Sequence, residues 1–470
     1  MQKDNSSTIK LLALFMIGAV LWVTPVSNEI SVQSWHLLVI FICTMSGIVL
    51  NPLPISAIAL LSASVCLASG TLNTDQILKG FSDKVVWLLI FAFLIARAMI
   101  KTGLGKRIAY YFISKFGSTT IGVSYGLTLT EFLLSPVIPS VTARSGGIVY
   151  PIAQAVSNEY GKGHGEGFAK KTTGYIMQVC FQANIITSAM FLTSMSANPL
   201  IQSLMERENI SITWAGWAMG AIVPGIVSLI VLPLVIRFLH PPSINESPDA
   251  PAHAKKALKE MGPLSGKEII MMITFSFLII CWILGKQVGL DATATAMIGV
   301  VALLLTKVLD WSDVVNEKSA WDTMVWFAII VMLSGYLADF GTIKWLSTKI
   351  ALSLSHHAAI VAVPVLLLLY FYLHYMFASV TAHATVLFTT FLFLISSFGI
   401  PTLLTGMVLA FFSSLSGGLT HYGTAVAPIF YESKSVDTKK WWKIGFVTSL
   451  VNISIWSVIG GMWWKYLGWF

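Results

Sequence analysis

Charged side chains are scarce in this sequence, and their scarcity excludes most kinds of soluble protein. Asp, Glu, Lys and Arg make up 11% of the 470 residues, whereas hydrophobic residues make up 56%. Because soluble domains carry about 25% charged residues, soluble enzymes, nucleic-acid-binding modules and disordered scaffolds do not fit this composition. The sequence therefore predicts a polytopic membrane protein with an all-α fold.

Cysteine is also rare, and its placement gives no sign of a disulfide framework or a metal site. All four cysteines lie inside apolar stretches without paired spacing: Cys43, Cys66, Cys180 and Cys281. Paired or clustered cysteines would be expected for disulfide or zinc sites. We therefore expect neither redox chemistry nor a bound metal or cofactor.

The first apolar run, residues 11–26, has features of a signal peptide but lacks a cleavage site. Lys3 and Lys10 precede it, as basic residues precede the apolar region of a secretory signal. No small-residue cleavage motif follows the run. We expect it to be a retained first helix.

Apolar runs long enough to cross a membrane recur along nearly the whole chain. A helix needs about 20 apolar residues to span the hydrocarbon. Two runs, 120–157 and 358–397, are long enough to cross twice, but their centres contain polar residues, proline or histidine, and we expect each to form a re-entrant helical hairpin. About eleven other runs are candidate spans: 9–27, 33–50, 53–70, 84–104, 172–195, 213–238, 268–285, 289–308, 322–340, 401–428 and 441–463.

The placement of Lys and Arg predicts the orientation of these spans. Cytoplasmic loops retain positive charge, and a cytoplasmic N-terminus with two re-entrant hairpins leaves about 20 Lys and Arg inside and about seven outside. A single crossing at either hairpin would remove this asymmetry. The pattern predicts a multi-pass protein of a bacterial-type inner membrane, surrounded by lipid, with its N-terminus in the cytoplasm.

A polar segment divides the chain into two halves. Residues 241–266 are rich in proline, alanine and charge, and we interpret them as a cytoplasmic linker. Residues 1–70 would form N-terminal scaffold helices and residues 71–240 a first repeat. Residues 267–470 would form a second repeat.

The two halves contain the same motifs in the same order. Each has an apolar span, a glycine turn and an amphipathic run, then a hairpin with an SVTA motif, then a span ending in a helix-breaking segment. These elements lie at 84–117, 140–147 and 194–199 in the first half and at 322–355, 379–386 and 423–428 in the second. By the span count the two copies enter the membrane from opposite sides, which is typical of secondary transporters built from inverted repeats.

The SVTA motifs and the helix breaks supply the candidate binding residues. Ser140 and Ser379 begin the second arm of each hairpin, where free amides, hydroxyls and the positive end of the helix dipole attract an anion. One Ser-x-Thr alone would more often bond its own helix, but its repetition favours one site for two carboxylates. The full substrate-binding set is Ser140, Val141, Thr142, Arg144, Ser196, Asn198, Ser379, Val380, Thr381, His383 and Thr424.

Arg144 and His383 hold equivalent positions directly after each SVTA motif. An ionisable group within a membrane usually marks a functional site, and we expect both residues to recognise substrate charge. An alternative stays open for Arg144, because Glu131 has the spacing needed to pair with it across the two hairpin arms. His374 and His421 would either line the cavity or bond to the protein, and the sequence leaves this choice open.

No enzyme motif accompanies these residues. The sequence contains neither H-E-x-x-H nor G-x-S-x-G, and the glycine-rich stretch 161–167 lacks the ending of a phosphate loop. We expect no catalytic residues and no nucleic-acid partner.

The extended motifs resemble the divalent anion sodium symporter family, and the resemblance covers nearly the whole chain. Residues 140–152, 194–200 and 379–387 are most similar to bacterial citrate/succinate and tartrate/succinate exchangers and to plastid 2-oxoglutarate/malate translocators. The resemblance implies a scaffold and a transport domain in each protomer, a homodimer, and elevator-type alternating access.

Two departures from the family pattern bear on the mechanism that the resemblance implies. The family signature at the hairpins is Ser-Asn-Thr, whereas Val141 and Val380 stand at the asparagine positions. The Thr-Pro-Pro-Asn-like breaks of sodium-coupled members are reduced to Asn198 and Pro199 in the first half and Pro428 in the second. The amides assigned to substrate carboxylates and part of the sodium-binding pattern are therefore missing.

Built-in cations would replace sodium in this interpretation. A sodium ion beside Arg144 and His383 would meet like-charge repulsion in a low-dielectric site, and an empty site with buried positive charge would resist movement. We predict a sodium-independent antiporter of di- or tricarboxylates, of the 2-oxoglutarate, malate, succinate or citrate class. A sodium-coupled symporter of the same fold is the alternative, and an anion channel or an intramembrane enzyme would be a more distant one.

Overall fold

The computed structural model describes residues 2–24, 29–161, 166–246, 249–342, 344–346, 348–349 and 358–470. Over these ranges the chain is helical, with one isolated bridge between Thr119 and Glu246 and no named strand. The all-α fold class is confirmed. Parts of four predicted segments lie outside the described residues: the first span (25–27), the glycine-rich stretch (162–165), the linker (247–248) and the amphipathic run ending at 355.

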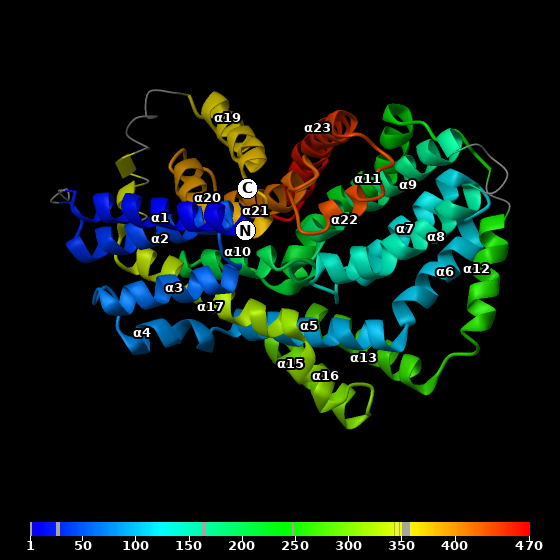
Figure 1. The fold of residues 1–470 in the computed structure, drawn as a ribbon, viewed down its shortest axis with the longest axis horizontal. Coiled ribbons are helices and arrows are strands. Elements are labelled where there is room, and N and C mark those ends of the chain that lie inside the picture. The colour runs from blue at the N-terminus through cyan, green and yellow to red at the C-terminus, as the bar shows by residue number, and fades with distance from the viewer. Residues whose placement is uncertain are drawn as a thin grey trace.

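Three N-terminal helices pack side by side: α1 (Gln2–Trp22), α2 (Val32–Leu50) and α3 (Ile55–Ala68) (Figure 1). Ser31 begins α2 as its N-cap, because its side chain accepts a hydrogen bond from the amide of Ser34. Asn51 ends the helix in the left-handed conformation, with φ of 48°. The chain can then reverse direction into α3 within a few residues.

The first half contains two amphipathic elements, a hairpin and a broken helix. Gly103, with φ of 78°, separates α5 from α6 by a left-handed turn that favours glycine. The elements are α4 (Thr74–Leu78), η1 (Lys79–Ser82), α5 (Lys84–Thr102), α6 (Leu104–Phe116), α7 (Thr120–Leu134), η2 (Thr142–Val149), α8 (Tyr150–Gly161), α9 (Glu166–Met190), η3 (Leu192–Ser194), α10 (Ala197–Arg207) and α11 (Trp214–Leu239).

The second half repeats this order after the linker helix α12 (Asp249–Glu260). Its elements are α13 (Gly266–Ile283), α14 (Gly285–Val288), α15 (Ala292–Leu305), α16 (Trp311–Asn316), α17 (Lys318–Asp339), α19 (Ala359–Tyr372), η4 (Leu373–Met376), α20 (Val380–Ser396), α21 (Thr402–Ser416), α22 (Ala427–Tyr431), α23 (Thr438–Ile455), η5 (Trp456–Gly460) and α24 (Gly461–Tyr466).

The two expected hairpins coincide with pairs of helices. The run 120–157 corresponds to α7 and α8, and the run 358–397 corresponds to α19 and α20. Each pair is followed by a helix that stops and restarts, α9 with α10 and α21 with α22. The opposite orientation of the two copies in a membrane stays a prediction.

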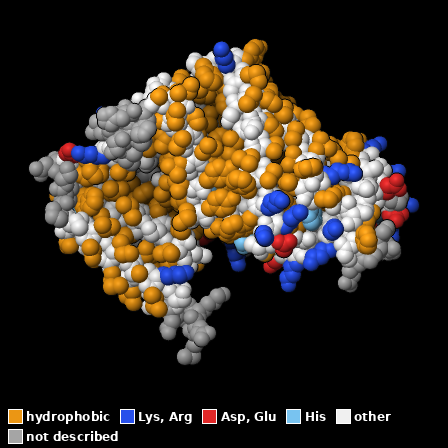
Figure 2. Space-filling model, turned by 90° about the horizontal axis from the view of Figure 1, so that it is seen from above, with side chains coloured by type: hydrophobic (Ala, Val, Ile, Leu, Met, Phe, Trp, Pro, Cys, Tyr) orange, Lys and Arg blue, Asp and Glu red, His pale blue; other side chains and the backbone are white. Residues whose placement is uncertain are grey.

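The described part of the chain contains seven helices that are long and apolar enough to cross a membrane: Val32–Leu50, Lys84–Thr102, Trp214–Leu239, Gly266–Ile283, Lys318–Asp339, Ala359–Met376 and Thr438–Tyr466. This number is smaller than the eleven or so expected because several apolar helices, α3, α15 and α21 among them, have only 14 or 15 residues. Apolar side chains cover most of the face in Figure 2, and most charged side chains gather at one end. This surface is that of a multi-pass membrane protein.

Ion pairs join the amphipathic helices to their neighbours. Arg107 Nε on α6 donates to Glu268 Oε1 on α13 at 2.5 Å, and its Nη1 donates to the carbonyl of Gly262 at 2.9 Å. Lys101 at the end of α5 contacts Asp310 and Asp313 beside α16. These bonds fix α6 and α16 against the spans that they follow.

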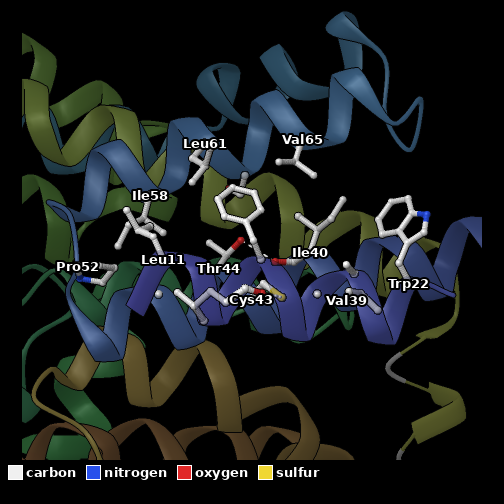
Figure 3. Close-up of a pocket in the computed structure, with 16 residues that line it drawn as sticks. Leu11, Trp22, Val39, Ile40, Cys43, Thr44, Pro52, Ile58, Leu61 and Val65 are labelled. Carbon is white, nitrogen blue, oxygen red and sulfur yellow. Dashed lines mark hydrogen bonds between the residues drawn. The ribbon is translucent and has the colours of Figure 1, made fainter. Parts of the chain in front are cut away.

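An apolar groove of about 850 Å³ lies between α1, α2 and α3 (Figure 3). Leu11, Trp22, Val39, Ile58 and Val65 are among its lining residues. Its few polar side chains bond to backbone carbonyls, as Thr44 Oγ1 does to Ile40 at 2.7 Å. The groove is therefore suited to hydrocarbon rather than to a carboxylate.

Candidate substrate site at the hairpin tips

Both hairpins turn back into a helix that starts at a serine. Ser140 Oγ accepts from the amide three residues later at 3.2 Å, and its carbonyl accepts from the amide of Arg144 at 2.8 Å. In the second hairpin Ser379 Oγ accepts from the amide three residues later at 3.4 Å, and its carbonyl accepts from the amide of His383 at 3.0 Å. The repeated SVTA motif is thus a repeated helix cap.

Hydroxyl groups at the two helix starts stay accessible in an otherwise buried region. Ser140, Thr142, Ser379, Thr381 and, at the first break, Ser196 are all partly exposed. The first amides of a helix have no intrahelical acceptor and point outward with the positive end of the dipole. Each tip therefore combines amide and hydroxyl donors in the arrangement that binds anions at helix N-termini.

The two valines of the motif are packing residues in this structure. Val141 and Val380 are 8% and 1% exposed. A Cβ placed on Gly417 would come within 3.0 Å of Val380 Cγ2 and 2.6 Å of Thr424 Cγ2. The hairpin tip therefore lies directly against the second helix break, where glycine is needed, and the valines form part of that contact.

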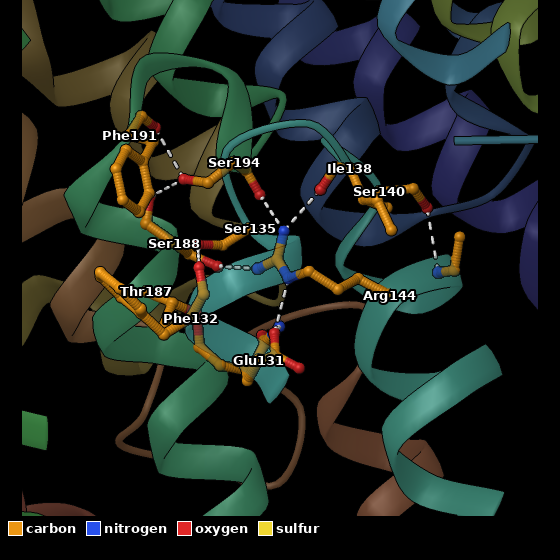
Figure 4. Close-up of polar contacts among 12 residues, drawn as sticks. Glu131, Phe132, Ser135, Ile138, Ser140, Arg144, Thr187, Ser188, Phe191 and Ser194 are labelled. Carbon is orange, nitrogen blue, oxygen red and sulfur yellow. Dashed lines mark hydrogen bonds and ion pairs between the residues drawn. The ribbon is translucent and has the colours of Figure 1, made fainter. Parts of the chain in front are cut away.

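Arg144 is fully buried and bonds within the protein (Figure 4). Its Nε donates to Glu131 Oε1 at 2.6 Å, and its Nη1 donates to the carbonyls of Ile138 at 2.5 Å and Ser194 at 2.7 Å. Its Nη2 donates to Ser188 Oγ at 3.0 Å. The ion pair across the hairpin arms, which the sequence left open, is present. A direct contact between Arg144 and a substrate carboxylate stays a prediction, since these donors are already used.

Glu131 compensates the charge of Arg144. Its Oε1 also accepts a hydrogen bond from Asn184 Nδ2 at 2.7 Å, and its Oε2 is buried without a partner. The pair is 0% exposed on both sides. A buried cation held beside a buried carboxylate adds no net charge to the site, so the first hairpin attracts an anion through its helix start.

Asn198 and Thr424 stabilise the two helix breaks. Asn198 is buried, and its Nδ2 donates to the carbonyls of Ser188 and Phe191 at 2.7 and 2.8 Å. Its Oδ1 accepts from Ser414 Oγ at 3.0 Å, which joins the first break to α21 of the second half. Thr424 Oγ1 accepts from the amide two residues later at 3.2 Å and is 2% exposed. Their polar groups are thus used inside the protein.

The three histidines of the second half have different partners. His383 Nε2 lies 2.9 Å from the carbonyl of Tyr370, and His374 Nε2 lies 2.9 Å from the carbonyl of Gly423. His421 Nδ1 accepts from the indole of Trp442 at 3.0 Å. His374 therefore bonds to a backbone carbonyl, whereas His421 has an aromatic partner that the sequence did not suggest.

Polar residues on α9 complete the support of the site, and sequence reasoning missed them. Asn184 and Ser188 bond to the ion pair, and Gln182 Nε2 donates to the carbonyl of Gly418 at 2.9 Å. Several amide and hydroxyl side chains within one span are a signal that was available in the sequence, because polar groups inside a membrane are costly unless they have partners.

Comparison with known families decides the kind of protein. Residues 5–470 match the family model described as the sodium:sulfate symporter transmembrane region. The chain belongs to this family. The resemblance to the divalent anion sodium symporters is thereby confirmed, and the paired hairpins are those of a sodium:sulfate symporter family transporter.

Relatives within the sodium:sulfate symporter family match the chain almost from end to end. YflS of Bacillus subtilis (strain 168), which bears a provisional name as a malate transporter, is 45% identical over 99% of both chains. Dicarboxylate transporter 1, chloroplastic, of Spinacia oleracea is 43% identical over 99% of this chain and 82% of its own. The inner membrane protein YbhI of Escherichia coli (strain K12) is 33% identical over 99% of both chains.

A solved structure supports the fold. The YdaH transporter of Alcanivorax borkumensis, whose crystal structure is described as having an unusual topology, aligns with a TM-score of 0.57 at 13% identity. The alignment covers 84% of this chain and 88% of the other. The similarity in fold therefore extends beyond the range in which sequence identity is informative.

Proposed function

We propose that this transporter exchanges one dicarboxylate for another without sodium. The observation that carries the proposal is the duplicated helix start, with Ser140 and Ser379 as equivalent caps. Two anion-binding helix starts match a substrate with two carboxylates. The relatives named as a malate transporter and as a dicarboxylate transporter favour malate, succinate, 2-oxoglutarate or citrate over an inorganic anion.

The use of backbone carbonyls supports sodium independence. Sodium would need oxygen ligands of the kind that unwound helix segments offer. In the first half the guanidinium of Arg144 already bonds the carbonyls of Ile138 and Ser194. In the second half His374 bonds the carbonyl of Gly423. Nitrogen donors thus occupy the oxygens that a sodium ion would require.

Bonds between the two halves support movement of the hairpins and breaks as one unit. Ser414 bonds Asn198, and Gln182 bonds the carbonyl of Gly418, so each break is attached to the other half. A Cβ on Gly146 of the first hairpin would come within 2.7 Å of Ile429 on α22. We infer that this unit carries the substrate in an elevator-type movement against the remaining helices. The substrate-binding groups would be Ser140, Thr142, Ser196, Ser379 and Thr381.

The homodimer and the inner-membrane location with a cytoplasmic N-terminus belong to the same proposal. The relative YbhI is named as an inner membrane protein. Cross-linking in native membranes would test the dimer, and a reporter fused to the N-terminus would test its side.

Transport in proteoliposomes tests the function directly. Purified protein would be reconstituted with or without internal succinate, and uptake of labelled malate would be measured in sodium or choline chloride. We expect uptake only into succinate-loaded vesicles, with equal rates in both salts. Uptake into empty vesicles that requires sodium would overturn the proposal in favour of a symporter, and single-channel currents far above carrier rates would indicate a channel.

A further inference from the structure

Two buried histidines of the second hairpin use only one of their ring nitrogens. His374 and His383 are 0% exposed, and their ring centroids are 5.2 Å apart. Each Nε2 faces a backbone carbonyl, which only accepts hydrogen bonds, so each Nε2 carries the hydrogen. The Nδ1 atom of each neutral ring is therefore an acceptor, and both Nδ1 atoms are buried without a partner.

The first hairpin has a charged group and a counter-ion where the second has neither. His383 stands at the position equivalent to Arg144, and Tyr370 stands at the position equivalent to Glu131. Arg144 is permanently charged and is compensated by Glu131. His383 contacts Tyr370 only through its carbonyl and its ring, so no acidic group compensates a charge there.

The second histidine makes the other contact that Arg144 makes in the first half. Arg144 donates to the carbonyl of Ser194, the first residue of the first break motif. His374 donates to the carbonyl of Gly423, the first residue of the equivalent motif. Two titratable rings together thus replace one permanent cation.

The surroundings of the two rings contain no charged partner. Within the described residues neither ring forms an ion pair, and the side chains that contact His383 are Tyr370, Phe377 and His374. The hydroxyl of Tyr370 is engaged with Ser413. The helices that pack against α20 add few titratable groups: none on α21, Tyr370 and Tyr372 on α19, Glu206 and Arg207 at the end of α10, and His36 and Cys43 on α2.

We propose that His374 and His383 form a proton site that fills when a dicarboxylate binds. This inference rests on the proposed function. One proton from water forms an N–H bond at Nδ1 of one ring, and no other covalent bond changes. In the empty carrier the positive start of α20 disfavours a protonated ring nearby. A dianion at Ser379 and Thr381 reverses that preference, so the loaded carrier moves one proton together with its substrate.

Calorimetry on the purified protein counts this proton. Succinate binding would be measured at about pH 7.5, where carboxylates are fully ionised, in two buffers with different heats of ionisation. The dependence of the observed heat on the buffer gives the number of protons taken up. We expect a value close to one for the unchanged protein. His374→Gln together with His383→Gln, which keeps the donor to each carbonyl, should bring it close to zero.

Matched controls are available among the other histidines. His36 stacks on Trp22 at 3.7 Å between centroids, and His421 bonds Trp442. His36→Gln and His421→Gln should leave the proton uptake unchanged. An uptake that persists in the double variant, or that disappears in His36→Gln, would overturn the inference.

A second measurement needs no variant. If one proton accompanies each succinate, the dissociation constant should rise about tenfold for each pH unit on the alkaline side of the proton site. A dissociation constant that stays constant between about pH 7 and 9 would overturn the proton site and leave the exchange function intact. Absence of any succinate binding would instead overturn the proposed function, and the proton site with it.

Discussion

Arg144 Nε lies 2.6 Å from Glu131 Oε1, and this pair joins the two arms of the first hairpin in the buried interior. The guanidinium also bonds the carbonyl of Ser194 in the first helix break. One side chain thus holds both arms and the break together. The pair is therefore a structural element of the site as much as an electrostatic one.

Removing the carboxylate should destabilise the protein. Glu131→Gln leaves the guanidinium of Arg144 buried without a counter-ion, which costs about 3–5 kcal/mol. We expect a large loss of monodisperse protein after extraction and a lower melting temperature. The exposed Glu432→Gln is the matched control and should have no effect. Normal assembly of Glu131→Gln with altered transport would show instead that the carboxylate serves the substrate.

The bond between Asn198 and Ser414 should couple the two halves energetically. A double-mutant cycle of Asn198→Ala and Ser414→Ala, followed by thermal unfolding, should give a coupling of about 0.5–1.5 kcal/mol. Ser416 bonds the carbonyl of Ser413, and a cycle of Asn198→Ala with Ser416→Ala should give a coupling near zero. Equal values for the two cycles would argue against a direct link between the first break and α21.

Loss of one helix-start hydroxyl should weaken substrate binding. Ser379→Ala removes a donor to a charged carboxylate, worth about 1.5–3 kcal/mol, and the half-saturation concentration for succinate should rise at least about tenfold. Ser397, at the other end of the same helix, bonds the carbonyl of Leu394, so Ser397→Ala should transport normally. If the two variants are indistinguishable, the helix start is not the substrate site.

Asp313 should stabilise the protein in a pH-dependent way. Burial alone would raise the pKa of Asp313, but its hydrogen bond from Lys101 and the charge of Arg97 hold the pKa below its usual range. A carboxyl group with a lowered pKa stabilises the folded state above its unfolded pKa and loses that effect as the pH falls through the folded value. Asp313→Asn should cost about 1–3 kcal/mol at neutral pH.

Melting curves over a range of pH test this sign. The difference in melting temperature between the unchanged protein and Asp313→Asn should be constant from about pH 8 to 5 and should shrink only below about pH 4. A difference that has already closed at about pH 6 would contradict the role of the Lys101 contact.

The positions of helices followed from the sequence more readily than the direction of side chains. The hairpin expected at 358–397 is α19 with α20, because uninterrupted apolar runs on both sides of a polar centre admit few other arrangements. The spacing of Glu131 and Arg144 allowed their pairing but did not decide it. That decision depends on the carbonyls of Ile138 and Ser194, which become available only when the helices break.

Residues beside a helix break were the hardest to assign. Asn198 was expected to bind substrate, yet it bonds the carbonyls of Ser188 and Phe191, which the break itself leaves without helical partners. His374 had no visible partner in the sequence because Gly423 is 49 residues away. Sequence spacing places such residues on an element, but the partner depends on how distant segments pack.

Protection of engineered cysteines by substrate tests the central claim, that both helix starts hold the same dianion. Cys43 is the one partly exposed native cysteine among the described residues, so a Cys43→Ala background would carry Ser140→Cys or Ser379→Cys. Modification by a charged thiol reagent would be followed with increasing succinate. The account predicts that succinate protects both positions over the concentration range in which it saturates exchange by each variant. Protection at one position alone would contradict it.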